Sequence, residues 1–375
     1  MKIPSPISLE PHAPDIAEQV GALRPGLGVY LLESAQGYAH LAWSANLRRR
    51  LTRLLISPDG RSQGLLGRVR NSIPTIKCWP TGSSLENSLL LYELARLHHP
   101  TDYLKRLRLR LPWFVGMTTT DPFPRLTVLN RFPERGDPFF GPFSSRDAAQ
   151  WYEQETLGLF QLRRCTERLL PHPDHPGCIY GEMNQCLRPC QCAVSSEEYA
   201  SEAQRVIEFL SSNGKTTVAV LAAARDRACD EMDFESAAYI HKRIENIQGT
   251  AAVRDDVIRE VRDFNGIALT RDVEPECFRL WPMMQGLWQE PLVIQFDTAN
   301  VTAKSLDECL RERLNVSMST IETGRKRVED LAIFARWYFS SSRDGQWFAF
   351  TTLADLNYRR LVREISKLAK SRPAM

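Results

Sequence analysis

The N-terminal segment alternates two short β-forming runs with a turn and then changes to helical spacing. Residues 28–32 are rich in β-forming side chains, and residues 38–43 return beside them as the second strand of a hairpin. In residues 47–55 leucines recur at intervals of three and four positions with arginines between them, and Asn46 caps this helix. The pattern predicts a hairpin followed by a helix with one apolar stripe and one basic face.

A second helix is predicted after Ser83. Glu86 follows three residues later, at the spacing of a capping box, and Pro100 ends the helical pattern. Strand, turn, strand, basic helix and second helix together make one small α/β unit.

The remainder of the chain is predicted to contain short strands, then helices, then a mixed region. Ser195 with Glu198 repeats the capping-box spacing at the start of one of these helices. The helices 216–230 and 234–247 are separated by three residues and form a helical hairpin. The expected strands are 113–115, 126–129, 139–143, 265–269 and 292–296, and the other expected helices are 144–160, 195–213, 304–313 and 327–339.

These elements predict an α+β protein with several domains. We expect a small α/β domain at 20–105, connecting strands with a cysteine-rich segment at 106–195, a helical region at 196–250 and an α/β region at 251–375. With 375 residues, 43% hydrophobic and 25% charged, the composition excludes collagen-like, rod-like and wholly disordered classes. The sequence shows neither a leader nor an apolar run of the roughly 18 residues that a membrane span needs, so we expect a cytoplasmic protein.

Positive charge is concentrated in one part of the chain. Residues 41–110 carry 13 Lys and Arg against 4 Asp and Glu, although the whole chain has a net charge of only +3. This segregation is typical of a domain that faces a polyanion, and it is equally typical of a solvated helix face.

Five of the nine cysteines lie between residues 165 and 192. Twelve, seven and three residues separate Cys165, Cys178, Cys186 and Cys190, in a segment rich in proline and glycine. Four thiolates that converge from loops hold zinc or an iron–sulfur cluster, and ligands of one type do not distinguish the two metals. Scattered buried or free cysteines are the structural alternative.

Five features of the sequence, in the same order, resemble the N-terminal half of the bacterial UvrC family of excinuclease proteins. The first half of its GIY-YIG nuclease signature resembles residues 28–30, and the basic helix that follows resembles residues 46–51. The other matches are residues 124–126 with 139–143, the four cysteines, and residues 232–238 with 243–244, which are similar to the family's UVR motif.

The resemblance implies a DNA-repair nuclease with a cofactor and a protein partner. It places a 4Fe-4S cluster on Cys165, Cys178, Cys186 and Cys190, with zinc as the alternative. It also implies that the UVR hairpin docks on the excinuclease partner protein UvrB. The expected partner-binding residues are Phe234, Ala237, Ala238 and Ile244.

Hydrolysis of a phosphodiester needs a metal-binding carboxylate, a group that activates water, and a cation on the phosphate. By resemblance, Tyr30 positions or deprotonates water, Arg50 holds the phosphate and Glu93 binds Mg²⁺ or Mn²⁺. His40 stands where the family has its second signature tyrosine, and histidine titrates near neutral pH. Glu93 is assigned with a shift of one residue, since the ungapped position is Tyr92.

The function expected from the resemblance is a metal-dependent DNA endonuclease of nucleotide excision repair. We expect it to make a single incision in damaged duplex, because the chain is expected to lack the RNase H-like second nuclease and the helix-hairpin-helix DNA-binding tail of longer members. One alternative is a DNA-binding adaptor that docks UvrB without cutting, and another is a zinc-stabilised nucleic-acid module outside repair. The expected phosphate-contacting residues are Arg48, Arg49, Arg53, Arg68, Arg70, Lys105, Arg106, Arg108 and Arg110.

Overall fold

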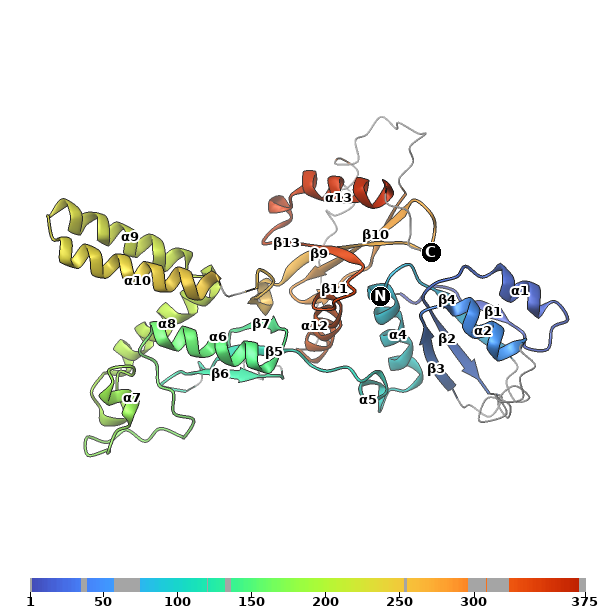
Figure 1. Cartoon of the computed structure of the whole chain (residues 1–375). Coiled ribbons are helices and arrows are strands. Elements are labelled where there is room, and N and C mark those ends of the chain that lie inside the picture. Colours follow the sequence, from blue (N-terminus) through green and yellow to red (C-terminus); the bar gives the residue numbers. More distant parts are fainter. Residues whose placement is uncertain are drawn as a thin grey trace. The chain divides into compact units, whose positions relative to one another are not determined.

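The structure is a computed structural model that describes residues 2–34, 39–56, 75–119, 121–131, 136–252, 255–295, 308 and 324–370. The chain divides into two compact units (Figure 1). One unit combines residues 1–110 with 265–321 and 336–375, and the other combines 111–264 with 322–335. Each unit therefore joins segments that are far apart in the sequence.

The first unit begins with a four-stranded antiparallel sheet in the order β1-β4-β2-β3. Its strands are β1 (Ile7–Leu9), β2 (Gly28–Glu33), β3 (Ala39–Ser44) and β4 (Thr75–Pro80). Its helices are α1 (Ile16–Ala22), α2 (Leu47–Leu55), α4 (Ser84–His98) and α5 (Tyr103–Leu107). The predicted hairpin 28–32/38–43 is present as β2 and β3, as far as its residues are described.

The two faces of this sheet bury different helices, because successive side chains of a strand point to opposite sides. Tyr30 and Leu32 of β2 pack with the leucines of α2, whereas Val29 and Leu31 pack with Leu90 and Leu94 of α4. The apolar stripe that the sequence predicts on residues 47–55 thus covers one face, and α4 covers the other.

Two local features fix where these helices begin. Gly28 allows β2 to approach α2, because a Cβ there would lie 2.6 Å from Leu47 Cδ2 and 2.8 Å from the carbonyl oxygen of Trp79. Ser83 caps α4 by accepting the Glu86 N–H at 3.1 Å. The expected capping box is only half present, since the Glu86 carboxylate accepts the N–H of Gly82 at 2.9 Å instead of that of Ser83.

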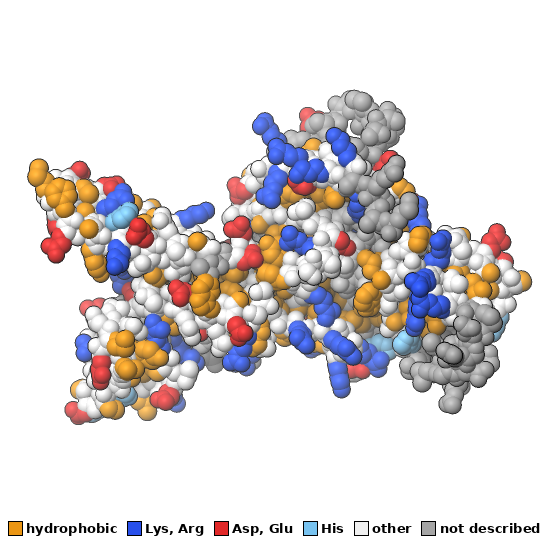
Figure 2. Space-filling view, in the orientation of Figure 1, with side chains coloured by type: hydrophobic (Ala, Val, Ile, Leu, Met, Phe, Trp, Pro, Cys, Tyr) orange, Lys and Arg blue, Asp and Glu red, His pale blue; other side chains and the backbone are white. Residues whose placement is uncertain are grey.

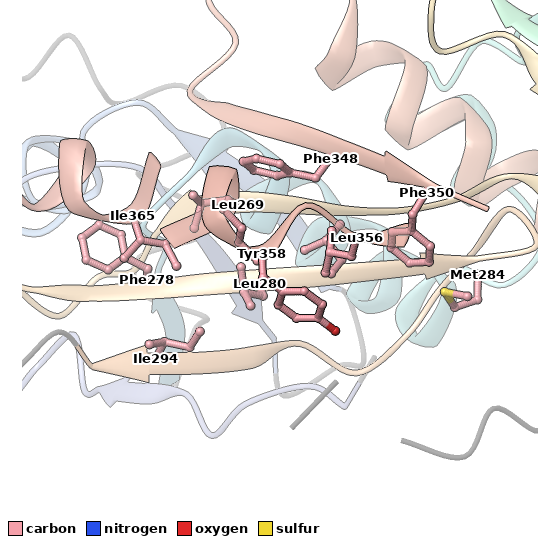
Figure 3. Packing of buried hydrophobic residues seen from close by; sticks show 12 residues of the cluster. Leu269, Phe278, Leu280, Met284, Ile294, Phe348, Phe350, Leu356, Tyr358 and Ile365 are labelled. Atoms are coloured by element: carbon pink, nitrogen blue, oxygen red, sulfur yellow. The ribbon is translucent and has the colours of Figure 1, made fainter. Parts of the chain in front are cut away.

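The first unit also contains a second sheet, in the order β11-β10-β9-β13 with β12 paired to β10. Its strands are β9 (Asn265–Arg271), β10 (Cys277–Met284), β11 (Leu287–Trp288), β12 (Leu292–Gln295) and β13 (Gly345–Phe350). The turn η4 (Leu353–Asp355) and helix α13 (Tyr358–Lys370) follow β13. Figure 3 shows the core between this sheet and α13, where Leu269, Phe278, Leu280, Phe348 and Ile365 meet.

A buried ion-pair network joins this second sheet to the start of α4. Arg279 on β10 contacts Glu86 at 2.5 Å and Asp272 at 2.5 Å. Both carboxylates are nearly enclosed, with side chains 7% and 6% exposed. The same contact region includes Ser84, whose N–H and hydroxyl donate to Asp344.

The second unit contains a third antiparallel sheet, in the order β6-β5-β7-β8, with helices following it. The strands are β5 (Trp113–Met117), β6 (Leu126–Leu129), β7 (Phe139–Phe143) and β8 (Arg259–Glu260), and the turn η3 (Val261–Asp263) follows β8. The helices and turns are α6 (Arg146–Leu159), α7 (Ile179–Glu182), η2 (Pro189–Gln191), α8 (Ser196–Ser212), α9 (Lys215–Asp230) and α10 (Phe234–Ala252), with most of α12 (Gly324–Tyr338). In Figure 1, α9 and α10 lie side by side as two long helices.

The α+β class is confirmed, because three antiparallel sheets carry separate helices. The predicted capping box at Ser195 is complete, with both reciprocal hydrogen bonds to Glu198. The predicted strand 292–296 is present as β12 in its described part, and the predicted helix 304–313 lies outside the described residues. None of the helices described here has the length and apolar character needed to cross a bilayer.

Candidate functional site

The first sheet places Tyr30 and His40 on the same face. Tyr30 pairs with Ala42, and Leu32 pairs with His40, in the β2–β3 register. Paired residues of an antiparallel sheet share a face, and positions 30 and 32 of one strand do so as well. Tyr30 and His40 therefore both face the side of the sheet that α2 covers.

Arg50 of α2 reaches the Tyr30 hydroxyl. Its Nε donates to the Tyr30 oxygen at 3.1 Å, and its guanidinium carbon lies 6.0 Å from the ring centre. The Asn46 side chain accepts a hydrogen bond from the Arg49 N–H at 2.9 Å. This cap fixes the first turn of α2, and with it the position of Arg50. The Tyr30 side chain is buried, so this hydroxyl is held beside a cation inside the domain.

His40 lies in a cationic environment at the edge strand β3. Burial lowers the pKa of His40 from its usual value, and the charges of Arg50, Arg106 and His99 lower it further. The lowered pKa favours the neutral form of the His40 imidazole, which is the form that can accept a proton. The sequence pattern indicated Arg50 and Arg106 as cations but gave no reason to place them around one histidine.

His99 is a second histidine of this neighbourhood, one that the sequence pattern did not indicate. It follows α4 directly and hydrogen-bonds the backbone of Ala39, the residue before His40. Burial lowers its pKa, as does the charge of Arg106. A lone histidine after a helix carries no signal in the sequence, because only the packing of α4 against β3 brings it to the site.

Glu93 comes from α4, the helix on the opposite face of the sheet from α2. Its carboxylate contacts Arg96 at 3.5 Å, and its side chain is 17% exposed. The neighbouring Tyr92 is buried and meets Tyr103 edge to face at 6.0 Å. The structure brings Tyr30, His40 and Arg50 into one neighbourhood, whereas Glu93 pairs along its own helix.

A ready-made metal cage is absent from the part of the chain that the structure describes. No three or more His, Cys, Asp or Glu side chains there stand where they would together hold an ion. A Mg²⁺ ion commonly uses only one or two protein carboxylates and completes its shell with water and substrate phosphate. Glu93, a partly exposed carboxylate, meets that minimum.

Several other cations of α2 and of the α5 segment are exposed. Arg49 and Arg53 on α2 and Lys105, Arg108 and Arg110 at α5 are exposed. Some of the expected phosphate contacts also have structural partners: Arg48 donates to the carbonyl of Gly21 at 3.3 Å, and Arg106 donates to Asp102 at 2.7 Å. Arg68 and Arg70 lie outside the described residues.

The four spaced cysteines lie close enough to affect one another electrostatically. Burial raises the pKa of Cys186, and the charges of Cys165, Cys178 and Cys190 raise it further, against a 3.4 Å hydrogen bond from the Arg188 N–H. Burial and the charges of Cys178 and Cys165 likewise raise the pKa of Cys190. None of the four forms a disulfide. The loops thus gather the thiols without closing them to metal-ligand geometry.

A buried arginine, which the sequence pattern did not indicate, anchors the cysteine segment. The Arg163 side chain is 2% exposed, contacts Asp121 at 2.5 Å, donates to the carbonyl of Phe123 at 2.8 Å and lies 3.8 Å from Cys165 Sγ. Its backbone N–H donates to the Tyr199 hydroxyl at 2.9 Å, and burial raises the pKa of that tyrosine. These bonds tie the start of the cysteine segment to α8 and to the loop before β6.

The helices α9 and α10 separate the four expected partner-binding residues into two groups. Ala237 and Ile244 are buried, whereas Phe234 is 69% exposed and Ala238 is also exposed. Met232 and Tyr239 add further exposed apolar surface near the tip of this pair. Two of the four residues therefore hold the pair together, and the other two remain available to a partner.

Part of the second unit matches a known protein family. The UvrC/Cho excinuclease middle domain matches residues 112–209, from β5 to α8. Over these residues the chain is similar to proteins of the UvrC family. The matched part contains all four spaced cysteines, Arg163 and Tyr199, whereas Tyr30, Arg50 and the α9–α10 pair lie outside it.

Relatives in the UvrC family align over longer stretches of the chain. The UvrABC system protein C of Acetivibrio thermocellus is 26% identical over 335 residues, 86% of this chain and 52% of the relative. That of Nitratidesulfovibrio vulgaris is 29% identical over 252 residues, and that of Alcanivorax borkumensis is 28% identical over 225 residues, covering 64% and 59% of this chain and 36% of each relative. The aligned part spans only a third to a half of the length of these UvrC proteins. No solved structure matches the chain.

Proposed function

We propose that this chain is a DNA endonuclease component of nucleotide excision repair, with a single incision site in the domain of β2, β3 and α2. The observation that carries the proposal is the 3.1 Å hydrogen bond from Arg50 to the Tyr30 hydroxyl, with His40 on the same face of the sheet and within the electrostatic reach of Arg50. A guanidinium, a phenol and an imidazole in one neighbourhood are the groups that phosphodiester hydrolysis uses.

Each residue has a distinct task in the proposed reaction. Arg50 binds the non-bridging oxygens of the scissile phosphate, because a guanidinium fork matches a phosphate. Tyr30 orients the attacking water, and His40 accepts its proton as the water oxygen bonds to phosphorus. The phosphorus–oxygen bond to one deoxyribose breaks, and the departing sugar oxygen takes a proton from solvent water. Glu93 would hold Mg²⁺ or Mn²⁺, which supplies charge stabilisation at the phosphate when bound.

A nicking assay tests the proposal. Damaged plasmid or duplex is incubated with Mg²⁺, UvrB and the full chain. We expect nicks that Tyr30→Phe, Arg50→Gln and Glu93→Gln each reduce by about a hundredfold or more, as for removal of one transition-state contact. Lys215→Gln is the control, because Lys215 is an exposed cation on α9 that belongs neither to the proposed site nor to the expected phosphate contacts. Intact DNA with the wild-type chain would refute the proposal.

The same proposal assigns a 4Fe-4S cluster to Cys165, Cys178, Cys186 and Cys190. Support comes from the donor set, which is four free thiols on loops. Three of these thiols raise the pKa of the fourth, Cys186, so they lie near it. Anaerobic purification tests it, since a cluster gives a brown protein with broad absorption near roughly 400 nm. A colourless protein with bound zinc would replace the cluster by a zinc site, and Cys192→Ala is the control that should change neither outcome.

Docking on UvrB is assigned to the exposed side of the α9–α10 pair. Two helices with exposed Phe234, Ala238 and Tyr239 leave apolar surface that a partner's helices can cover. Calorimetry with purified UvrB tests this. Phe234→Ala should weaken binding at least tenfold, whereas Leu97→Ala, an exposed leucine on α4, should leave it unchanged. Equal affinity for both variants would exclude this surface.

One observation favours a second candidate, a DNA-binding adaptor without cleavage. Glu93 pairs with Arg96 on its own helix, on the opposite face of the sheet from the helix that carries Arg50. An adaptor would bind DNA and UvrB with unchanged affinity in the Tyr30→Phe and Glu93→Gln variants, and the wild type would give no nicks. The nicking assay therefore separates the two candidates.

A further inference from the structure

The outward face of α13 is strongly cationic. Over Tyr358–Lys370 the helix carries five Lys and Arg residues, all exposed, against the single acid Glu364. Figure 2 shows Lys and Arg side chains gathered where α13 lies in Figure 1. The five cations are Arg359, Arg360, Arg363, Lys367 and Lys370. Among the described helices only α2 has a comparable excess, with four arginines and no acid.

These five cations share one face of the helix. With about 100° of rotation per residue, they fall within an arc of about 100°. With a rise of about 1.5 Å per residue, they extend over about 16 Å along the axis. Along the axis of a DNA duplex each strand has one phosphate about every 3.4 Å, so about five phosphates of one strand lie along such a length.

The opposite face of α13 is fixed in the protein core. Tyr358, Leu361 and Ile365 are buried against β9, β10 and β13, as Figure 3 shows for Tyr358 and Ile365. An amphipathic helix binds a bilayer by burying its apolar face among lipids. The apolar face of α13 is already occupied, so the helix presents charge alone, on a rigid support.

Few of the cations are neutralised by the protein itself. Lys367 contacts Glu364 at 2.6 Å, and Arg360 stacks over the Phe348 ring at 5.6 Å. Among the described residues, Arg359, Arg363 and Lys370 have no carboxylate partner. An ordered row of unpaired cations is suited to a polyanion, because each phosphate that it neutralises releases a condensed counterion.

We propose that α13 is a binding surface for the phosphate backbone of duplex DNA, separate from the cations of α2 and α5. This inference rests on the proposed function for one point, the choice of DNA as the polyanion. Binding at α13 does not require that the protein cleaves DNA. Because the helix offers cations without a shaped pocket, the surface binds without preference for base sequence.

Fluorescence anisotropy of a labelled 25-base-pair duplex with the full chain tests the inference. The Arg359→Gln/Arg363→Gln/Lys367→Gln triple variant removes three of the five cations, and glutamine retains a high helix propensity. The matched control is Lys215→Gln/Lys242→Gln/Arg243→Gln, which removes three exposed cations from α9 and α10. Circular dichroism and thermal melting should show both variants folded like the wild type.

At 0.1 M salt we expect the α13 variant to bind the duplex about tenfold to a hundredfold more weakly than the wild type. The slope of log affinity against log salt should fall by about two to three, since each phosphate contact contributes about 0.9. The control variant should change neither quantity by more than about twofold. Unchanged affinity and slope in the α13 variant would overturn the inference.

Two further arms distinguish the partner and the proposed function. Vesicles of phosphatidylserine serve as a membrane probe, and loss of vesicle binding with intact DNA binding in the α13 variant would overturn the DNA assignment. If the wild type fails to nick DNA but the α13 variant loses duplex binding, the endonuclease proposal fails and this inference stands. If the wild type nicks DNA and the α13 variant binds the duplex normally, the endonuclease proposal stands and this inference fails.

Discussion

The ion-pair network at Arg279 allows a quantitative test of how the first unit is held together. Arg279 lies 2.5 Å from Glu86 and 2.5 Å from Asp272, and its own side chain is 19% exposed. The variant Arg279→Met keeps the aliphatic stem and removes the guanidinium. Two nearly enclosed carboxylates would then face each other without a cation.

The expected loss of stability follows from this burial. Removing one partner of a buried ion pair costs about 3–5 kcal/mol, because the remaining charge stays desolvated. Since Arg279 is partly exposed and water can reach the site, we expect a loss at the lower end of this range, about 3 kcal/mol in the free energy of unfolding at pH 7.5. Arg24→Met is the matched control, because Arg24 pairs with Glu274 at 2.8 Å with both side chains well exposed, and it should cost less than about 1 kcal/mol.

The loss should also depend on pH. Burial already raises the pKa of Glu86 in the folded protein, against the charge of Arg279. Without Arg279 that pKa rises further, so the folded state binds a proton more tightly than the unfolded state does. Stability of the variant is therefore lowest above the folded pKa and recovers as the pH falls through it, by at most about 1.4 kcal/mol for each unit of pKa difference.

Urea denaturation followed by circular dichroism and tryptophan fluorescence measures both effects, at pH 5 and pH 7.5. The double variant Arg279→Met/Glu86→Gln should regain a large part of the lost stability at pH 7.5, because it removes one of the two stranded charges. A loss below about 1 kcal/mol, or a loss equal at both pH values, would refute the reasoning.

Three other expectations concern the second unit and use the same denaturation assay. Ser195→Ala should lower the free energy of unfolding by about 1 kcal/mol, because it breaks the capping box with Glu198 at the start of α8. An unchanged urea midpoint would contradict this expectation. Tyr199→Phe should lower the free energy of unfolding by about 1–3 kcal/mol, because its hydroxyl makes one buried and one partly buried hydrogen bond to the backbone. A stability equal to that of the wild type would mean that water replaces them. Ile244→Ala should lower the free energy of unfolding by about 2–4 kcal/mol, because the Ile244 side chain is buried. Phe234→Ala should lower it by less than about 0.5 kcal/mol, because the Phe234 side chain is exposed. Similar losses in the two variants would show that the two side chains do not differ in burial.

The local pattern of the sequence predicts several elements well. The leucine stripe at 47–55 gives α2, and the capping residues at Ser83 and Ser195 mark the starts of α4 and α8. The predicted strand 113–115 is present within β5. These signals are local. An element that is buried on one side has apolar residues at a period of 2 in a strand or 3.6 in a helix, and a capping residue bonds only to its own helix.

Other elements left too little local signal. The strands β4 and β13 were not predicted, and neither was α13, although its cationic face is clear once its apolar face is known. A buried strand can lack polar alternation, so short apolar runs do not separate strand from helix. Glu86 shows the same limit, since its carboxylate serves Gly82 and Arg279 rather than the expected partner.

The sequence by itself determined the elements with a clear periodicity or cap, such as α2 and α8, together with the segregation of positive charge and the spacing of the four cysteines. Tertiary structure alone decided which of those groups meet. Tyr30 and Arg50 are 20 residues apart in the chain, and Arg279 and Glu86 are 193 apart, yet each pair is in direct contact. Local periodicity records which face of an element is buried, but the partner that buries it depends on strand register and chain closure over long separations, which no local pattern carries.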